Sequence, residues 1–159
     1  MSKLKTTEVL DKINPRADLI GVYLKKNDST CHFFPRSVAP SKTKIDLAYK
    51  LNDVDISKEQ DLLACFVEFS LSGTMDQENA GSEDVFFIRA VINVTYKIDK
   101  IEELTPEEIE VYSNLSAVFN AFPYGREELQ STMARMGLPP FTIPLLKPST
   151  RSEMDSGNG

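Results

Sequence analysis

The sequence predicts an α+β fold in which a four-stranded antiparallel, Greek-key-like sheet carries two helices packed on one face. Two observations predict it. Four segments between residues 19 and 98 alternate apolar and polar residues with the two-residue period of strands. The chain after Leu104 changes to the three- and four-residue apolar spacing of helices. Strands followed by helices favour helices that gather on one face of an antiparallel sheet.

The strands are predicted over residues 19–26, 44–51, 62–72 and 84–98. In the first, Ile20, Val22 and Leu24 are expected on one face. The connection after it, residues 27–43, is long enough to skip a strand, which is the reason for the Greek-key expectation. An acidic turn is expected over residues 52–61.

The fourth strand is apolar on both faces at one end. Alternate residues from Phe86 to Ile98 form one apolar face, and Val85, Phe87 and Val91 add apolar groups to the other. A strand of this kind suggests a second covering layer or a partner subunit.

The helical part begins with the clearest local signal in the chain. Thr105 can cap a helix, Pro106 suits its first position and Glu108 completes a capping box. Pro123 is expected to end this first helix and to begin a second one, which ends at Gly137 before two prolines. The predicted organisation is a weakly structured extension over residues 1–18, one domain over residues 19–146 and a disordered tail over residues 147–159.

Composition excludes several classes of function. The 159-residue chain is 41% hydrophobic, which suits one domain with a real core, and its net charge of -6 without a basic patch argues against nucleic-acid or anionic-membrane partners. Two cysteines are too few for a disulfide scaffold. The N-terminus lacks the apolar core of a signal peptide, and no apolar run approaches the ~20 residues that cross a bilayer, so a cytoplasmic protein is expected.

Motifs of common enzymes are missing from the sequence. It has no glycine-rich phosphate loop and no nucleophile elbow, so we expect no enzyme and no cofactor. Cys31 and His32 leave a remote alternative, a Cys-His enzyme, although adjacent residues of an extended chain point to opposite faces. No spacing indicates a metal site.

One segment near the C-terminus carries a family resemblance. Residues 122–127 read Phe-Pro-Tyr-Gly-Arg-Glu, and after a short helix the chain continues with Gly-Leu-Pro-Pro at residues 137–140 and Ile-Pro-Leu at residues 143–145. This pattern resembles the C-terminal signature of the SecB family of protein-export chaperones, and the preceding order of strands is similar too. The resemblance covers residues 19–146, with its specific part in the last quarter.

The resemblance implies an ATP-independent holdase that binds non-native polypeptides, including preproteins before translocation, along apolar grooves. It also implies a homotetramer built as a dimer of dimers, with helices sandwiched between two sheets. Aromatic and apolar residues are the candidates for client contact, with core packing as the alternative for each: Phe33, Phe34, Tyr49, Phe86, Phe119, Phe122, Tyr124, Met133, Leu138 and Phe141.

The sequence departs from the family pattern at the surface that docks on the translocase motor. Typical members dock on the motor through acidic residues of the sheet and through a tail. This chain has Lys26 and Arg89 in the corresponding strands, and its tail after Leu146 is short. With these departures the chain resembles the looser SecB-like group, some members of which are chaperones of toxin-antitoxin pairs. A dedicated module that binds one folded partner or an antitoxin is therefore a second hypothesis.

Overall fold

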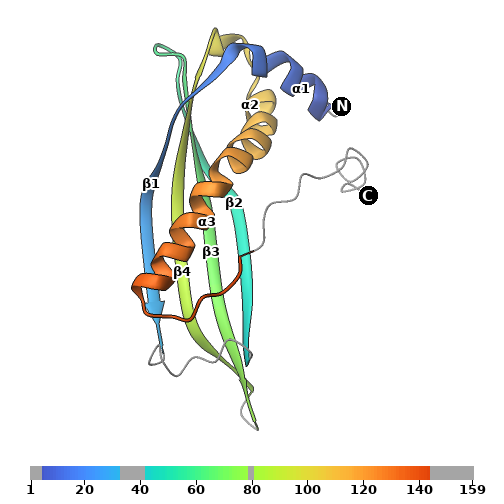
Figure 1. Ribbon diagram of the computed structural model, residues 1–159. Coiled ribbons are helices and arrows are strands. Elements are labelled where there is room, and N and C mark those ends of the chain that lie inside the picture. The colour runs from blue at the N-terminus through green and yellow to red at the C-terminus, as the bar shows by residue number, and fades with distance from the viewer. Residues whose placement is uncertain (1–4, 33–41, 79–80, 144–159) are drawn as a thin grey trace.

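The fold is a single antiparallel sheet with helices on one side. The computed structural model describes residues 5–32, 42–78 and 81–143 (Figure 1). Its strands are β1 (Ala17–Cys31), β2 (Thr43–Ser57), β3 (Leu62–Gln77) and β4 (Gly81–Ile98). Their spatial order is β1-β4-β3-β2, so β1 and β2 form the two edges and the chain crosses the whole sheet between them. The predicted antiparallel, Greek-key-like arrangement is confirmed.

The helices follow the strands along the chain, apart from a short one at the N-terminus. They are α1 (Thr6–Ile13), α2 (Pro106–Tyr112), the π-helical η5 (Ser113–Ala117) and α3 (Val118–Arg135), with short 3-10 turns η1 (Asn14–Arg16) and η4 (Ile101–Glu103). Figure 1 shows α2 and α3 crossing the same face of the sheet. Residues 137–143 then run below α3 toward β2 (Figure 1).

Pro123 does not separate two helices, so that prediction is wrong. It lies inside α3, and the division between α2 and α3 falls earlier, at the π-helical turn. Proline removes one backbone donor, which leaves only the Phe119 carbonyl without its helical partner. Burial of Phe122 and Leu129 against the sheet holds α3 together across this position. The predicted end at Gly137 is correct, because this glycine has φ of +72° and closes the helix in a left-handed conformation.

The strands are longer than predicted because bulges absorb residues that break the alternation. A register shift between Leu51 and Asp53 takes up one residue, and β2 then continues to Ser57, so the turn expected over residues 52–61 is confined to residues 58–61. A shift between Leu19 and Gly21 similarly leaves Ile20 without a register partner on β4.

The core lies between the sheet and the helices. The predicted inward residues of β3 are at most 1% exposed: Leu63, Cys65, Val67, Phe69 and Leu71. Each apolar side chain of this size stabilises the fold by roughly 1.5–3 kcal/mol when fully buried. The predicted capping box is present as well, since the Glu108 N–H donates to Thr105 Oγ1 at 3.2 Å and the Thr105 N–H donates to Glu108 Oε2 at 2.9 Å.

The N-terminal residues belong to this core, contrary to the expectation of weak structure. Val9 and Ile13 of α1 are 1% and 0% exposed. Lys12 of α1 donates to Glu108 Oε1 at 2.7 Å, and Arg16 donates to the Asp99 and Lys100 carbonyl oxygens. An apolar contact and a charged contact therefore fasten α1 to the helical layer.

The contact between Lys12 and Glu108 predicts an acid-dependent loss of stability. The Lys12 ammonium and the Thr105 N–H lower the pKa of Glu108. Because the folded pKa lies below that of the unfolded chain, about 4.3, the contribution is complete above that value and is lost as pH falls through the folded pKa. We expect the wild type to lose more stability toward acid than Glu108→Gln, measured by urea unfolding at about pH 7 and about pH 3.

Glu107→Gln is the matched control, because Glu107 is the exposed neighbour of Glu108 in the same helical turn. It should retain the acid sensitivity of the wild type. Equal acid sensitivity of wild type and Glu108→Gln would show that the contact contributes nothing to pH dependence.

Candidate functional site

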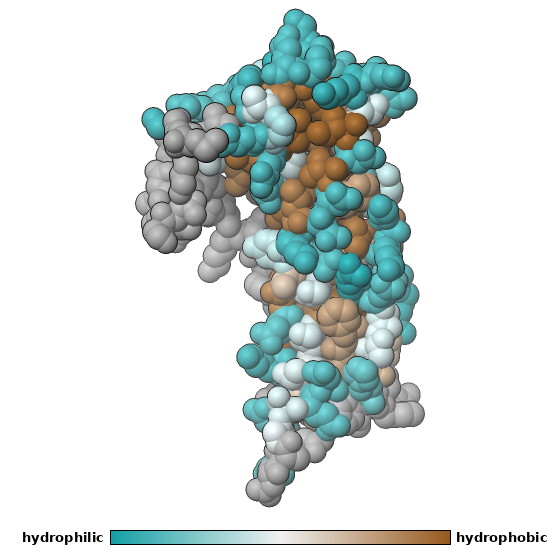
Figure 2. All heavy atoms as spheres, turned by 180° about the vertical axis from the view of Figure 1, so that it is seen from behind, coloured by the Kyte–Doolittle hydropathy of each residue, from teal (hydrophilic) through white to brown (hydrophobic). Residues whose placement is uncertain are grey.

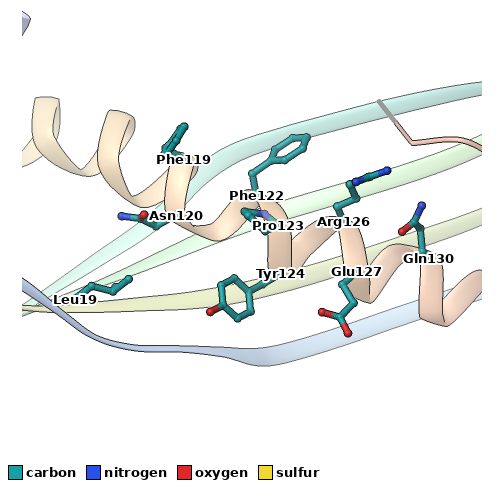
Figure 3. Close-up of a pocket in the computed structure, with 9 residues that line it drawn as sticks. All are labelled: Leu19, Phe119, Asn120, Phe122, Pro123, Tyr124, Arg126, Glu127 and Gln130. Carbon is teal, nitrogen blue, oxygen red and sulfur yellow. The ribbon is translucent and has the colours of Figure 1, made fainter. Parts of the chain in front are cut away.

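An open cleft with a volume of about 520 Å³ runs along α3 and reaches β1. We call it the apolar cleft; its lining residues are Leu19, Phe119, Asn120, Phe122, Pro123, Tyr124, Arg126, Glu127 and Gln130. Figure 3 shows Leu19 and Tyr124 on the side of β1, with Phe119 and Phe122 on the side of β2. One turn of α3 around Pro123 thus presents aromatic side chains in two directions.

Apolar side chains in this cleft are open to solvent. Phe119 is 60% exposed, Tyr124 is 48% exposed and Leu19 is 47% exposed. Single exposed apolar residues are ordinary, but a contiguous group that lines a hollow is typical of a surface that binds another molecule. The cleft is therefore our candidate functional site.

An aromatic cluster supports the cleft from the side of the sheet. Phe122 of α3 contacts Tyr49 of β2 edge to face at 5.4 Å and Phe69 of β3 at 5.9 Å between ring centroids. Phe69 and Tyr49 lie 6.1 Å apart. Such pairs contribute about 0.5–1.5 kcal/mol beyond their buried area. The three rings fix the position of Phe122, while Tyr49 stays 42% exposed at the edge of the sheet.

A second hollow of about 360 Å³ continues from the cleft. It lies between α3 and the segment after it, and Gln130 lines both hollows; its other lining residues are Met133, Ala134, Leu138, Pro139, Pro140 and Phe141. Two contacts hold the segment in place: the Phe141 ring lies 5.7 Å from that of Phe86, and Arg126 Nε donates to the Ile143 carbonyl oxygen at 3.2 Å. The two hollows together form an extended track along α3.

The structure divides the ten residues proposed for client contact. Phe119, Phe122 and Tyr124 line the apolar cleft, and Tyr49 joins them through the aromatic cluster. The second hollow is lined by Met133, Leu138 and Phe141. Phe86 is only 1% exposed and belongs to the core, and three of the lining residues are buried in the core as well, Phe122, Met133 and Leu138. Phe33 and Phe34 lie outside the described residues.

Several lining residues were not among the sequence candidates. Arg126 and Glu127 both line the cleft, and Arg126 also donates to the Ile143 carbonyl oxygen. Leu19 was missed because its place depends on the bulge after it, which turns Leu19 to the helix side of the sheet opposite Tyr96. Phe119, Pro123 and Glu127 follow one another at intervals of four residues, which places them on the same side of a helix. This spacing is the sequence signal that could have identified Pro123 and Glu127 as lining residues.

The described residues offer little for covalent or metal chemistry. Cys31 and His32 lie at the end of β1 and do not line the cleft. Burial raises the pKa of the Cys65 thiol to about 11, so this buried thiol stays protonated at neutral pH. Among residues 5–32, 42–78 and 81–143, no group of three or more His, Cys, Asp or Glu side chains is placed to hold a metal ion.

The outer face of the sheet, away from the helices, carries paired charges. Arg89 contacts Glu68 at 2.6 Å and Asp28 at 4.0 Å, and Lys26 contacts Asp28 at 3.0 Å. Lys25 lies 3.8 Å above the Phe66 ring. Figure 2 shows this face, with apolar side chains between charged ones. The two basic residues that depart from the family pattern are therefore neutralised by acidic neighbours.

Helices of the described part of the chain are all too short or too polar to cross a membrane. No protein-family model matches the chain, and no curated protein matches it either.

Among solved structures, the Rv1957 SecB-like chaperone of Mycobacterium tuberculosis, in complex with a ChAD peptide from the Rv1956 HigA1 antitoxin, is similar in fold. Its TM-score is 0.75 at 21% sequence identity, over 90% of this chain and 99% of that one. A protein of unknown function from Streptococcus agalactiae matches with a TM-score of 0.35 at 12% identity, over 81% of this chain and 97% of that one, which is too distant to inform. The chain therefore has the fold of a SecB-like chaperone.

Proposed function

We propose that this chain, which has the SecB-like fold, is an ATP-independent holdase that binds non-native polypeptides along the track formed by the apolar cleft and the second hollow. Its clients are extended segments with apolar side chains, and preproteins awaiting translocation in the cytoplasm are one class of them. The protein works as a homotetramer, a dimer of dimers with helices between two sheets.

The exposed aromatic surface of α3 carries this proposal. A holdase needs apolar surface that stays open to solvent until a client covers it, and Phe119 and Tyr124 provide such surface on a rigid helix. Unfolded chains expose apolar side chains that folded proteins bury, so an apolar track binds non-native states without recognising a particular sequence. Binding the unfolded state lowers its free energy by mass action, which requires no nucleotide.

A mixing experiment tests the proposal. The purified protein, added in molar excess to a slowly folding client, should delay the recovery of client activity in the absence of ATP. Light scattering should give a mass near four times the 17.8 kDa of the chain. An unchanged folding rate together with a strict monomer would contradict both parts of the proposal.

A second candidate function is the chaperoning of an antitoxin. It is favoured by the complex of the Mycobacterium tuberculosis neighbour with an antitoxin peptide. The paired charges of Lys26 and Arg89 point the same way, because they differ from the acidic docking surface that the export family implies. Pull-downs separate the candidates: a dedicated module retains one partner, whereas a general holdase retains many unfolded clients, and a translocase motor among them would favour the export function.

A further inference from the structure

Gly125 lies where α3 comes closest to the sheet. A Cβ atom placed on this buried helical glycine would lie 2.5 Å from two carbon atoms of the Phe69 ring on β3. Carbon atoms pack at about 3.5–4.0 Å, so an alanine here would force the helix and the ring apart by about 1 Å. Glycine is what permits the observed distance between α3 and β3.

This contact also supports the apolar cleft. Tyr124 and Arg126, the neighbours of Gly125 in α3, both line the cleft. On the other side of the contact, Phe69 supports the cleft residue Phe122 at 5.9 Å between ring centroids. A displacement at Gly125 therefore moves the cleft from two directions, through the helix backbone and through the aromatic cluster.

We infer that Gly125 is a positioning residue for polypeptide binding, because the contact of its bare backbone with Phe69 fixes the depth of the apolar cleft. The inference rests on the proposed function, since it concerns the affinity for polypeptide held in that cleft. Alanine is a better helix former than glycine. A loss of binding in Gly125→Ala therefore reports the contact with Phe69 and not a weaker helix.

A control for general destabilisation lies in α1. Ile13 is 0% exposed in the core and lines neither the apolar cleft nor the second hollow. Ile13→Ala leaves a cavity in the core at a distance from both hollows. This variant therefore reports general destabilisation without a collision at the cleft.

The test measures the binding of a fluorescein-labelled peptide of alternating leucine and serine by fluorescence anisotropy, with thermal unfolding giving the folded fraction of each variant. Gly125→Ala should raise the Kd on the order of tenfold, while Ile13→Ala should leave the Kd of its folded fraction unchanged. Shortening the ring with Phe69→Leu makes room for the methyl group. The double variant should therefore bind within about threefold of Phe69→Leu alone.

Two results would overturn the inference and leave the proposed function standing: wild-type affinity in folded Gly125→Ala, or the same loss in the Ile13→Ala and Gly125→Ala variants. The inference would also be overturned if Gly125→Ala still lowered the affinity in the Phe69→Leu background, because the collision with the ring would then not cause the loss of binding. A wild type that binds no peptide at all refutes the proposed function itself, and the inference with it.

Discussion

Replacing Phe119 and Tyr124 together by serine is expected to lower the affinity for non-native polypeptide on the order of 100-fold. Both side chains line the apolar cleft and are about half exposed or more. Aromatic residues at the centre of an interface typically contribute at least about 1–2 kcal/mol each, and each 1.4 kcal/mol is about tenfold in Kd. Because these side chains pack little against the core, the fold itself should keep its stability.

The measurement is the Kd for the labelled peptide together with the delay of client folding. A matched control replaces Tyr23 and Phe87 by serine, because these are also an exposed tyrosine and an exposed phenylalanine, at 56% and 42% exposure, on the outer face of the sheet. Light scattering on the same samples separates a loss of assembly from a loss of binding. Equal affinities for both double variants would place client binding somewhere other than the cleft.

Phe69→Ala is expected to cause the largest loss of stability of any single change considered. The side chain is 1% exposed and contacts Tyr49 and Phe122 as well as the backbone of α3 at Gly125. Truncation of a buried phenylalanine costs about 3–5 kcal/mol, because the lost burial is joined by a cavity that the structure cannot fill. For a domain of this size, 1 kcal/mol corresponds to about 2–4 °C, so Tm should fall by roughly 10 °C.

Thermal and urea unfolding measure this loss, with Phe87→Ala as the control. Phe87 is 42% exposed on the outer face of β4, so the same chemical change there should cost far less. If both variants unfold at the same temperature, Phe69 does not have the central place in the core that its contacts indicate.

Local chemistry explains the elements that the sequence predicts correctly. The capping box at Thr105 and Glu108 needs only residues three apart, and the left-handed end at Gly137 needs only a glycine. The inward face of β3 follows from strict alternation, since a strand with one buried face must bury every second residue. These features depend only on residues that are close together in the sequence, so the sequence is sufficient to predict them.

The misplaced elements depend on contacts between segments far apart in sequence. Pro123 indicates a helix end on local grounds, but packing of α3 on the sheet keeps the helix continuous through it. The helix α1 is too short to be stable alone, and it is held by burial of Val9 and Ile13 and by the contact of Lys12 with a residue 96 positions away. No local pattern of residues contains that information.

The sequence by itself determined the order of strands and helices, the antiparallel sheet and the aromatic residues that surround Pro123. The tertiary structure decided which of those aromatics face solvent, because burial depends on where α3 lies on the sheet. Gly125 and Phe69 set that distance, and the bulge in β1 turns Leu19 into the same cleft. Phe119 and Tyr124 consequently form an open surface, while Phe86, which has the same chemistry, is enclosed by the core.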